Sequence, residues 1–162
     1  MNLDANYYLS KEAFTGLKPT VDNASTGPTF QYNPEEAQIL FFNLSISKAS
    51  KKDKTQVVLV ETIVSKGKIK RDYPKSSPVK AFQLRCSFLD DQKNVLKQTT
   101  INHPLYRRYE YQDDEGQMQS KVVESNEGQF SLRTQLTEGI VYLQVEEILE
   151  DNQPIQLQTL KL

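Results

Sequence analysis

The chain has 162 residues and a mass of 18.6 kDa, which is the size of one typical domain. Its 20 Lys and Arg against 21 Asp and Glu leave a net charge of −1, so the overall charge does not favour nucleic acid or an anionic membrane surface as a partner. One Cys and one His exclude an internal disulfide and any zinc site that needs several such ligands. No apolar run approaches the roughly 18 residues of a membrane span.

The N-terminal part of the chain, residues 1–37, has the composition of an irregular segment. Residues 16–30 are rich in Gly, Pro, Asp and Asn, which favour loops. Asn33 followed by Pro34 and two Glu predicts one short helical turn, with Asn as the N-cap. The first residues lack the basic and apolar regions of a signal peptide, so we expect a cytoplasmic protein or a mature chain without its signal.

From residue 38 onward the pattern changes to that of β-strands. Residues 39–46 begin as a continuous apolar run and then alternate. Residues 57–64 are β-branched and apolar on both faces, which predicts a central strand or one covered on both faces. In residues 82–88, Phe, Leu, Cys86 and Phe alternate with polar residues, so this strand is predicted to be half-buried, with its thiol in the core.

The rest of the chain continues in short strands separated by turns rich in Asp, Asn and Gly. The strand pair in residues 139–162 resembles the closing hairpin of many immunoglobulin-like sandwiches. Eight or nine short strands without a helix of three turns predict a single all-β domain over residues 1–162. We expect an antiparallel β-sandwich, immunoglobulin-like in the broad sense, with its strands in residues 38–162 and the irregular segment packed on it. A closed barrel is the alternative.

The sequence contains no recognisable catalytic constellation. His103 is predicted to be an exposed loop residue without a companion, and Cys86 is predicted to face the core. Glu146 and Glu147 are adjacent on a strand, so they face opposite sides and cannot form an acid/base pair with each other. The acidic turn at residues 113–116 lacks the spacing of a calcium loop, and no glycine-rich phosphate loop is present. We therefore expect no enzyme activity, no cofactor and no metal.

The most distinctive local feature is a cluster of Tyr and Arg between residues 106 and 111. Alternation places Tyr109 and Tyr111 on one strand face, with Arg108 and Glu110 on the other. Tyr and Arg are enriched in binding hot spots because they combine a large area with a polar tip. A sugar-binding surface would use the two tyrosines together with Tyr106. The acidic residues in and after the cluster argue against nucleic-acid binding.

Charge is distributed unevenly along the chain. Residues 48–80 hold ten basic against three acidic side chains, and residues 109–162 hold eleven acidic against three basic ones. Most of the basic residues fall in two loops that flank the strand at 57–64. These loops could bind an acidic partner or the acidic region of a second copy. The candidate residues are Lys51, Lys52, Lys68, Lys70 and Arg71.

Together these features predict a non-catalytic interaction or accessory module that binds a protein partner. Two alternatives remain open at this stage. One is a carbohydrate-binding module that uses the Tyr-rich strand face, and the other is a structural subunit that self-associates through basic and acidic surfaces. Because all-β modules are common there, we expect a bacterial secreted, periplasmic or cell-surface protein rather than a cytoplasmic one.

Overall fold

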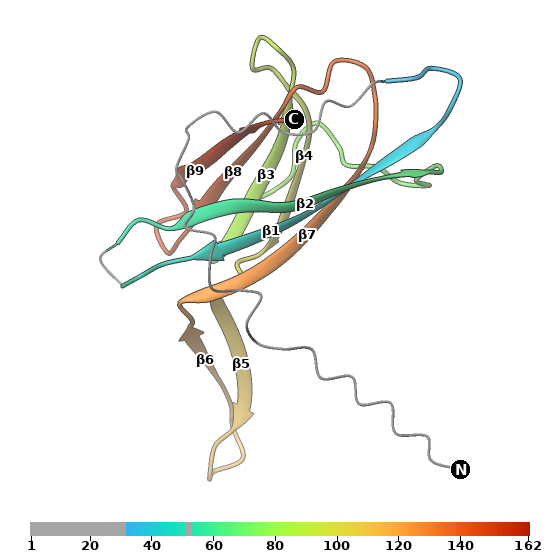
Figure 1. The fold of residues 1–162 in the computed structure, drawn as a ribbon. Coiled ribbons are helices and arrows are strands. Elements are labelled where there is room, and N and C mark those ends of the chain that lie inside the picture. The colour runs from blue at the N-terminus through green and yellow to red at the C-terminus, as the bar shows by residue number, and fades with distance from the viewer. Residues whose placement is uncertain (1–31, 51–52) are drawn as a thin grey trace, which may run out of the picture.

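The computed structural model describes residues 32–50 and 53–162, which form nine strands and no helix. The strands make a three-stranded sheet of order β2-β1-β7, a four-stranded sheet of order β4-β3-β8-β9, and a separate two-stranded hairpin, β5-β6 (Figure 1). Every pair of neighbouring strands is antiparallel. The strands are β1 (Gln38–Ser47), β2 (Gln56–Lys66), β3 (Gln83–Leu89), β4 (Val95–Asn102), β5 (Tyr106–Gln112), β6 (Met118–Glu124), β7 (Glu127–Gln135), β8 (Tyr142–Ile148) and β9 (Pro154–Lys161).

The core lies between the two larger sheets, and it follows from the alternation of apolar side chains. Every second residue of β1 from Leu40 to Ile46 is buried, and Cys86 and its neighbours two residues away on β3 are buried in the same way. The rings of Phe42 and Phe88 lie 5.8 Å apart and join the sheets. Burying one such ring contributes about 2–3 kcal/mol. The prediction of an antiparallel sandwich is therefore confirmed, as is the inward position of the thiol.

The interpretation of residues 57–64 as a central or doubly covered strand is wrong. β2 lies at the edge of the three-stranded sheet and pairs only with β1 among the described strands. Val58 and Val60 are 56% and 62% exposed. The register shifts between Asn43 and Leu44, so Val60 is an extra residue in a β-bulge. The β-branched composition fits a strand, but composition does not report how many neighbours that strand has.

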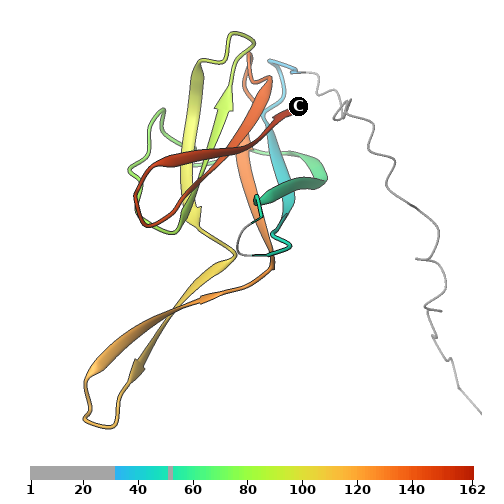
Figure 2. The same ribbon diagram turned by 90° about the vertical axis from the view of Figure 1, so that its left-hand side faces the viewer.

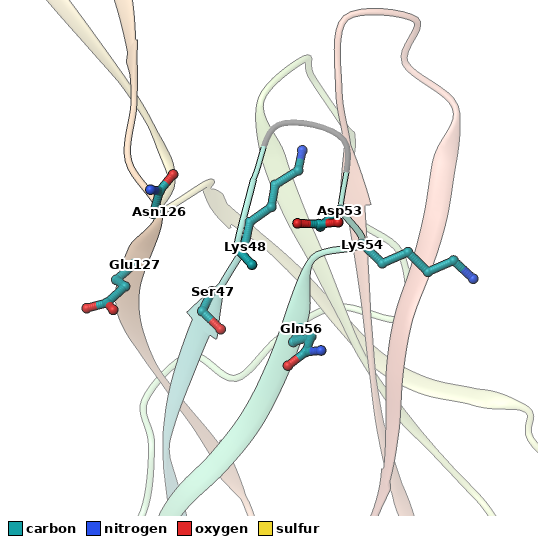
Figure 3. Close-up of a pocket in the computed structure, with 8 residues that line it drawn as sticks. Ser47, Lys48, Asp53, Lys54, Gln56, Asn126 and Glu127 are labelled. Carbon is teal, nitrogen blue, oxygen red and sulfur yellow. The ribbon is translucent and has the colours of Figure 1, made fainter.

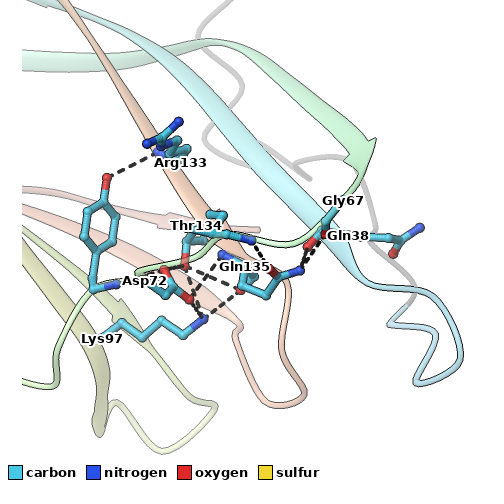
Figure 4. Close-up of polar contacts among 9 residues, drawn as sticks. Gln38, Gly67, Asp72, Lys97, Arg133, Thr134 and Gln135 are labelled. Atoms are coloured by element: carbon cyan, nitrogen blue, oxygen red, sulfur yellow. Dashed lines mark hydrogen bonds and ion pairs between the residues drawn. The ribbon is translucent and has the colours of Figure 1, made fainter.

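The connection from β2 to β3 crosses between the sheets and is held by Asp72 (Figure 4). The carboxylate accepts an ion-paired hydrogen bond of 2.6 Å from Lys97 of β4. It also accepts hydrogen bonds from the Thr134 hydroxyl and the Gln135 backbone amide, at 3.1 and 3.2 Å. The same ammonium donates to the Gln135 carbonyl oxygen at 2.7 Å. One carboxylate therefore connects the crossover, the four-stranded sheet and β7.

The residues before β1 form a single turn rather than a helix. The Asn33 side chain accepts a hydrogen bond of 3.0 Å from the Glu35 amide, and the Glu36 amide donates to the Asn33 carbonyl. The predicted capping role of Asn33 is thus confirmed, although the chain enters the sheet after one turn. Residues 1–31, the greater part of the predicted irregular segment, lie outside the described residues.

Candidate functional site

The hairpin β5-β6 projects away from the sandwich in both views (Figures 1 and 2). We call the hairpin, residues 106–124, the arm. Its strands pair in one continuous register from Tyr106 opposite Glu124 to Gln112 opposite Met118. Every residue of β5 beyond the first is exposed, as is every residue of β6 before the last. The apolar and aromatic exposed side chains of the arm are Tyr109, Tyr111, Met118, Val122 and Val123.

The tip of the arm is the Asp- and Gly-containing turn that the sequence predicts. Asp113 Oδ1 accepts hydrogen bonds from the backbone amides of Gln117 and Glu115, at 2.8 and 3.1 Å. The first of these bonds is the main cause that lowers the pKa of the Asp113 carboxyl, and a bond from the Gln119 side chain adds to it. Gly116 adopts a φ of 81°, which L side chains rarely adopt. These contacts fix the tip as a well-defined turn.

The root of the arm is anchored by His103, whose predicted exposure is wrong. The residue is 1% exposed, and its ring forms an edge contact with Tyr106 at a centroid distance of 4.8 Å. Nδ1 accepts a hydrogen bond of 3.2 Å from the Leu105 amide, and Nε2 lies 3.3 Å from Glu147 Oε2. Because Nδ1 accepts this hydrogen bond, the neutral ring carries its proton on Nε2, which donates a hydrogen bond to the carboxylate. Both ring nitrogens are thus used within the protein.

Glu147 is the buried acceptor of this cluster, and it is only 6% exposed. Thr55, in the segment before β2, donates a hydrogen bond of 3.0 Å to the same Oε2 atom. Burial raises the pKa of the Glu147 carboxyl, but the bonds from His103 and Thr55 outweigh burial and hold that pKa below its ordinary value. The carboxylate therefore links β8, the start of β2 and the root of the arm.

Close packing also fixes the direction of the arm. Leu105 is fully buried, and its carbonyl accepts a hydrogen bond of 2.7 Å from the amide of Ser125, which lies between β6 and β7. Gly128 in β7 lies against Pro104, so that a Cβ at this glycine would stand 2.7 Å from the proline Cβ. The root is therefore packed from both sides.

Replacing Gly128 by Ala is expected to destabilise the protein by about 1 kcal/mol, because the new methyl overlaps a rigid proline ring. Urea unfolding followed by circular dichroism measures the change. The matched control is Gly116→Ala at the tip, which strains one exposed turn. Only the root variant should also alter the amide NMR shifts of Leu105 and Ser125, and unchanged shifts there would contradict the packing argument.

A groove with a volume of about 950 Å³ lies at the base of the arm, between the arm and the sandwich. Among the described residues that line it, three are cationic, Lys80, Arg107 and Arg108, and none is acidic. Aromatic rings form part of the wall, with Phe82 and Tyr106 at a centroid distance of 5.3 Å. Such a lining suits a ligand that presents a carboxylate next to an apolar group.

The structure brings together three of the four arm residues predicted from sequence. Tyr106, Arg108 and Tyr109 line the groove, and Tyr111 lies farther along the arm. Because the strand register is unbroken, Tyr106 shares a face with Arg108, and the other two tyrosines occupy the opposite face. The predicted pairing of Tyr109 and Tyr111 on one face follows from this register. The three tyrosines do not form one flat platform.

The two basic loops lie at opposite ends of β1. The Gly67 amide bonds to the residue that precedes β1, whereas the Lys48 amide, just after β1, bonds to Asn126 near the arm. Ten strand residues separate these ends, or roughly 30 Å. Exposed Lys68, Lys70 and Arg71 are therefore remote from the arm. Lys51 and Lys52 lie outside the described residues. The basic loops do not form one continuous face in the part of the chain that the structure describes.

A second depression, of about 700 Å³, lies where β1 ends and β2 and β7 begin (Figure 3). Its lining carries both signs of charge, with Lys48 and Lys54 against Asp53 and Glu127. The ammonium of Lys54 and the carboxylate of Glu127 point in opposite directions in the close-up. This mixed lining selects no ligand charge.

Arg107, Lys80 and Phe82 line the groove but lie outside the set predicted from sequence. Arg107 adjoins the recognised cluster and could have been included. Lys80 and Phe82 come from the crossover before β3, and no local pattern relates that segment to the arm. The buried pair of His103 and Glu147 was also missed, although Glu147 has the parity of the inward residues of its strand.

The cysteine and the clusters of acidic residues in the described part of the chain are not arranged as a metal site or a reactive thiol site. Cys86 is fully buried, and burial raises the pKa of its thiol to about 12. Residues 32–50 and 53–162 contain no group of three His, Cys, Asp or Glu side chains placed to hold a metal ion. Within the same residues, no helix has the length and apolar character needed to cross a bilayer.

No protein-family model, no curated protein sequence and no solved structure matches this chain.

Proposed function

We propose that the chain is a non-catalytic interaction module that binds a protein partner through the arm and the groove at its base. The observation that carries the proposal is the exposure of the arm. Its strands pair only with each other among the described strands, and they present five apolar or aromatic side chains to solvent. We propose that the module belongs to a bacterial secreted or cell-envelope protein, and this part of the proposal is supported by the all-β fold alone.

The arm is a hairpin that would gain stability from a bound partner. A two-stranded hairpin without further packing is marginally stable in water, so a partner that covers one face would stabilise it. The buried root residues His103 and Leu105 already set the direction of the arm in the free protein. This pre-organisation reduces the conformational entropy that is lost on binding.

The groove favours a protein segment over a sugar. Its aromatic wall and its three cations match an acidic, partly apolar peptide segment. A sugar-stacking platform would use several rings on one face, and Tyr106 lies on the face opposite Tyr109 and Tyr111.

A photo-cross-linking amino acid at position 111 tests the proposal in cells that produce the protein. Tyr111 is 51% exposed on the arm, and Ile155 on β9, 46% exposed, is the matched control position. We expect Tyr111 to give one discrete protein adduct, identified by mass spectrometry, and Ile155 to give none of the same mass. Absence of an arm adduct, or the same adduct from both positions, would contradict the proposal.

A further inference from the structure

We propose that the protein bound by the arm is a second copy of this chain, joined by antiparallel pairing of the two β5 strands about a two-fold axis at Tyr109. This inference rests on the proposed function, because it takes the arm as the binding element and names its partner.

The free edge of β5 is suited to such pairing. One edge of the strand pairs with β6, and no other described strand pairs with β5. Its seven residues contain no proline, and the β5-β6 register has no bulge. Regular, exposed edges of this kind add strands from other chains. The apolar edge of β2 is less suited because the bulge at Val60 interrupts it.

The sequence of β5 is complementary to itself in one register. With Tyr109 on the axis, Arg108 of one copy lies opposite Glu110 of the other, and symmetry repeats this pair. Arg107 then faces Tyr111, a cation–π pairing, and the two Tyr109 rings meet at the axis. Moving the axis by one residue places Arg108 opposite Arg108 or Glu110 opposite Glu110, and like charges directly opposite each other are destabilising.

The edge of β6 does not offer the same complementarity. Full antiparallel overlap of two β6 strands, Met118–Glu124, places Lys121 opposite Lys121 at the axis. That arrangement repels, whereas the corresponding overlap of two β5 strands attracts. Charge therefore selects the β5 edge of the arm.

The same register brings the acidic tip of one copy to the basic groove of the other. Gln112 of the second copy lies opposite Tyr106, so the turn that follows lies beside the root of the first arm. That turn begins with Asp113, Asp114 and Glu115, and the groove presents Lys80, Arg107 and Arg108. A second copy thus supplies both an edge strand and the acidic group that suits the groove.

Reversal of the paired charges tests the inference by sedimentation velocity in roughly 50 mM salt. The unaltered chain should sediment as a dimer, at twice 18.6 kDa. Arg108→Glu and Glu110→Arg each place like charges opposite each other, so each variant alone should raise the dimer dissociation constant about tenfold or more. An equimolar mixture of the two variants restores both pairs and should form the dimer again. Lys161→Glu, a reversal at an exposed lysine on β9 outside the arm, should leave dimerisation unchanged.

A cysteine at the axis tests the register. Directly opposite residues have Cα atoms about 4.5–5.5 Å apart, within the range that a disulfide spans. Tyr109→Cys should therefore form a covalent dimer under mild oxidation. Tyr111→Cys should not, because its counterpart lies four residues away, about 13 Å along the strand. The native thiol, Cys86, is buried and does not interfere.

The failure of this inference can be told from failure of the proposed function. A monomer at all concentrations, or two single variants that do not dimerise when mixed, overturns the second copy as partner. If the cross-link at Tyr111 then still gives a discrete adduct of another protein, the arm remains the binding element. If that adduct is also absent, both proposals fail.

Discussion

Replacing Glu147 by Ala is expected to lower the free energy of unfolding by about 3 kcal/mol. The truncation leaves the buried His103 ring and the Thr55 hydroxyl without their common acceptor. Removing the charged acceptor of buried hydrogen-bond donors is among the most costly changes in a folded protein, because the donors stay desolvated and unpaired. Urea unfolding at pH 7, followed by far-ultraviolet circular dichroism, measures the loss.

Two comparisons separate the charge of Glu147 from its packing. Glu147→Gln keeps the shape and one acceptor oxygen, so it should cost less than the alanine variant. The dependence of the free energy of unfolding on pH then isolates the contribution of the charge. Because the folded-state pKa of the carboxyl lies below its ordinary value of 4.5, the ionised group stabilises the protein above that pH. This contribution disappears as the pH falls through the lower folded pKa, so the difference between the native chain and the Gln variant should narrow below pH 4.5.

Loss of the Glu147 side chain should also affect the arm, because Glu147 bonds a residue at its root. Its carboxylate holds His103 at the root, so the alanine variant should also increase amide hydrogen exchange at Leu105 and Tyr106. A variant of equal stability loss at a distant core position, Leu160→Ala, should not change exchange at the root selectively. If Glu147→Ala unfolds no more readily than the native chain, the buried hydrogen bonds do not stabilise the fold.

Sequence pattern predicted the strands well because the core is built by alternation. In β1 and β3, each inward position is apolar and its neighbours are mostly polar or half-buried, so the period of two is visible in the sequence. The β8-β9 hairpin was predicted for the same reason. The position of β2 was not, because Val58 and Val60 satisfy the strand pattern whether or not a neighbour covers them. Strand order depends on pairing partners far apart in the chain, which composition does not encode.

The sequence predicted only those site residues that are close to one another in the chain. Tyr106, Arg108 and Tyr109 are close in sequence, and their cluster was recognised. The burial of His103 depends on Glu147, which lies 44 residues later in the chain, and on Thr55, which is 92 residues from Glu147. The parity of Glu147 with Leu143 and Val145 is the signal that could have revealed an inward carboxylate, but the sequence-based prediction left His103 exposed and without a partner.

Replacing Asp72 by Ala is expected to lower the free energy of unfolding by about 2 kcal/mol. The change removes the ion pair with Lys97, whose side chain is only 13% exposed, and it removes the acceptor for the Thr134 hydroxyl and the Gln135 amide (Figure 4). The cost is smaller than for Glu147 because the Asp72 side chain is 23% exposed, so water can solvate part of the ammonium left behind.

The partner of Asp72 offers the control for that prediction. Lys97→Met removes the cation but keeps the length of the side chain, and Asp72 then retains its bonds to Thr134 and Gln135. We therefore expect the lysine variant to cost less than Asp72→Ala, and the double variant to cost less than the sum of the two. Urea unfolding of the three variants gives this comparison. Equal and additive losses would mean that the carboxylate does not act through Lys97.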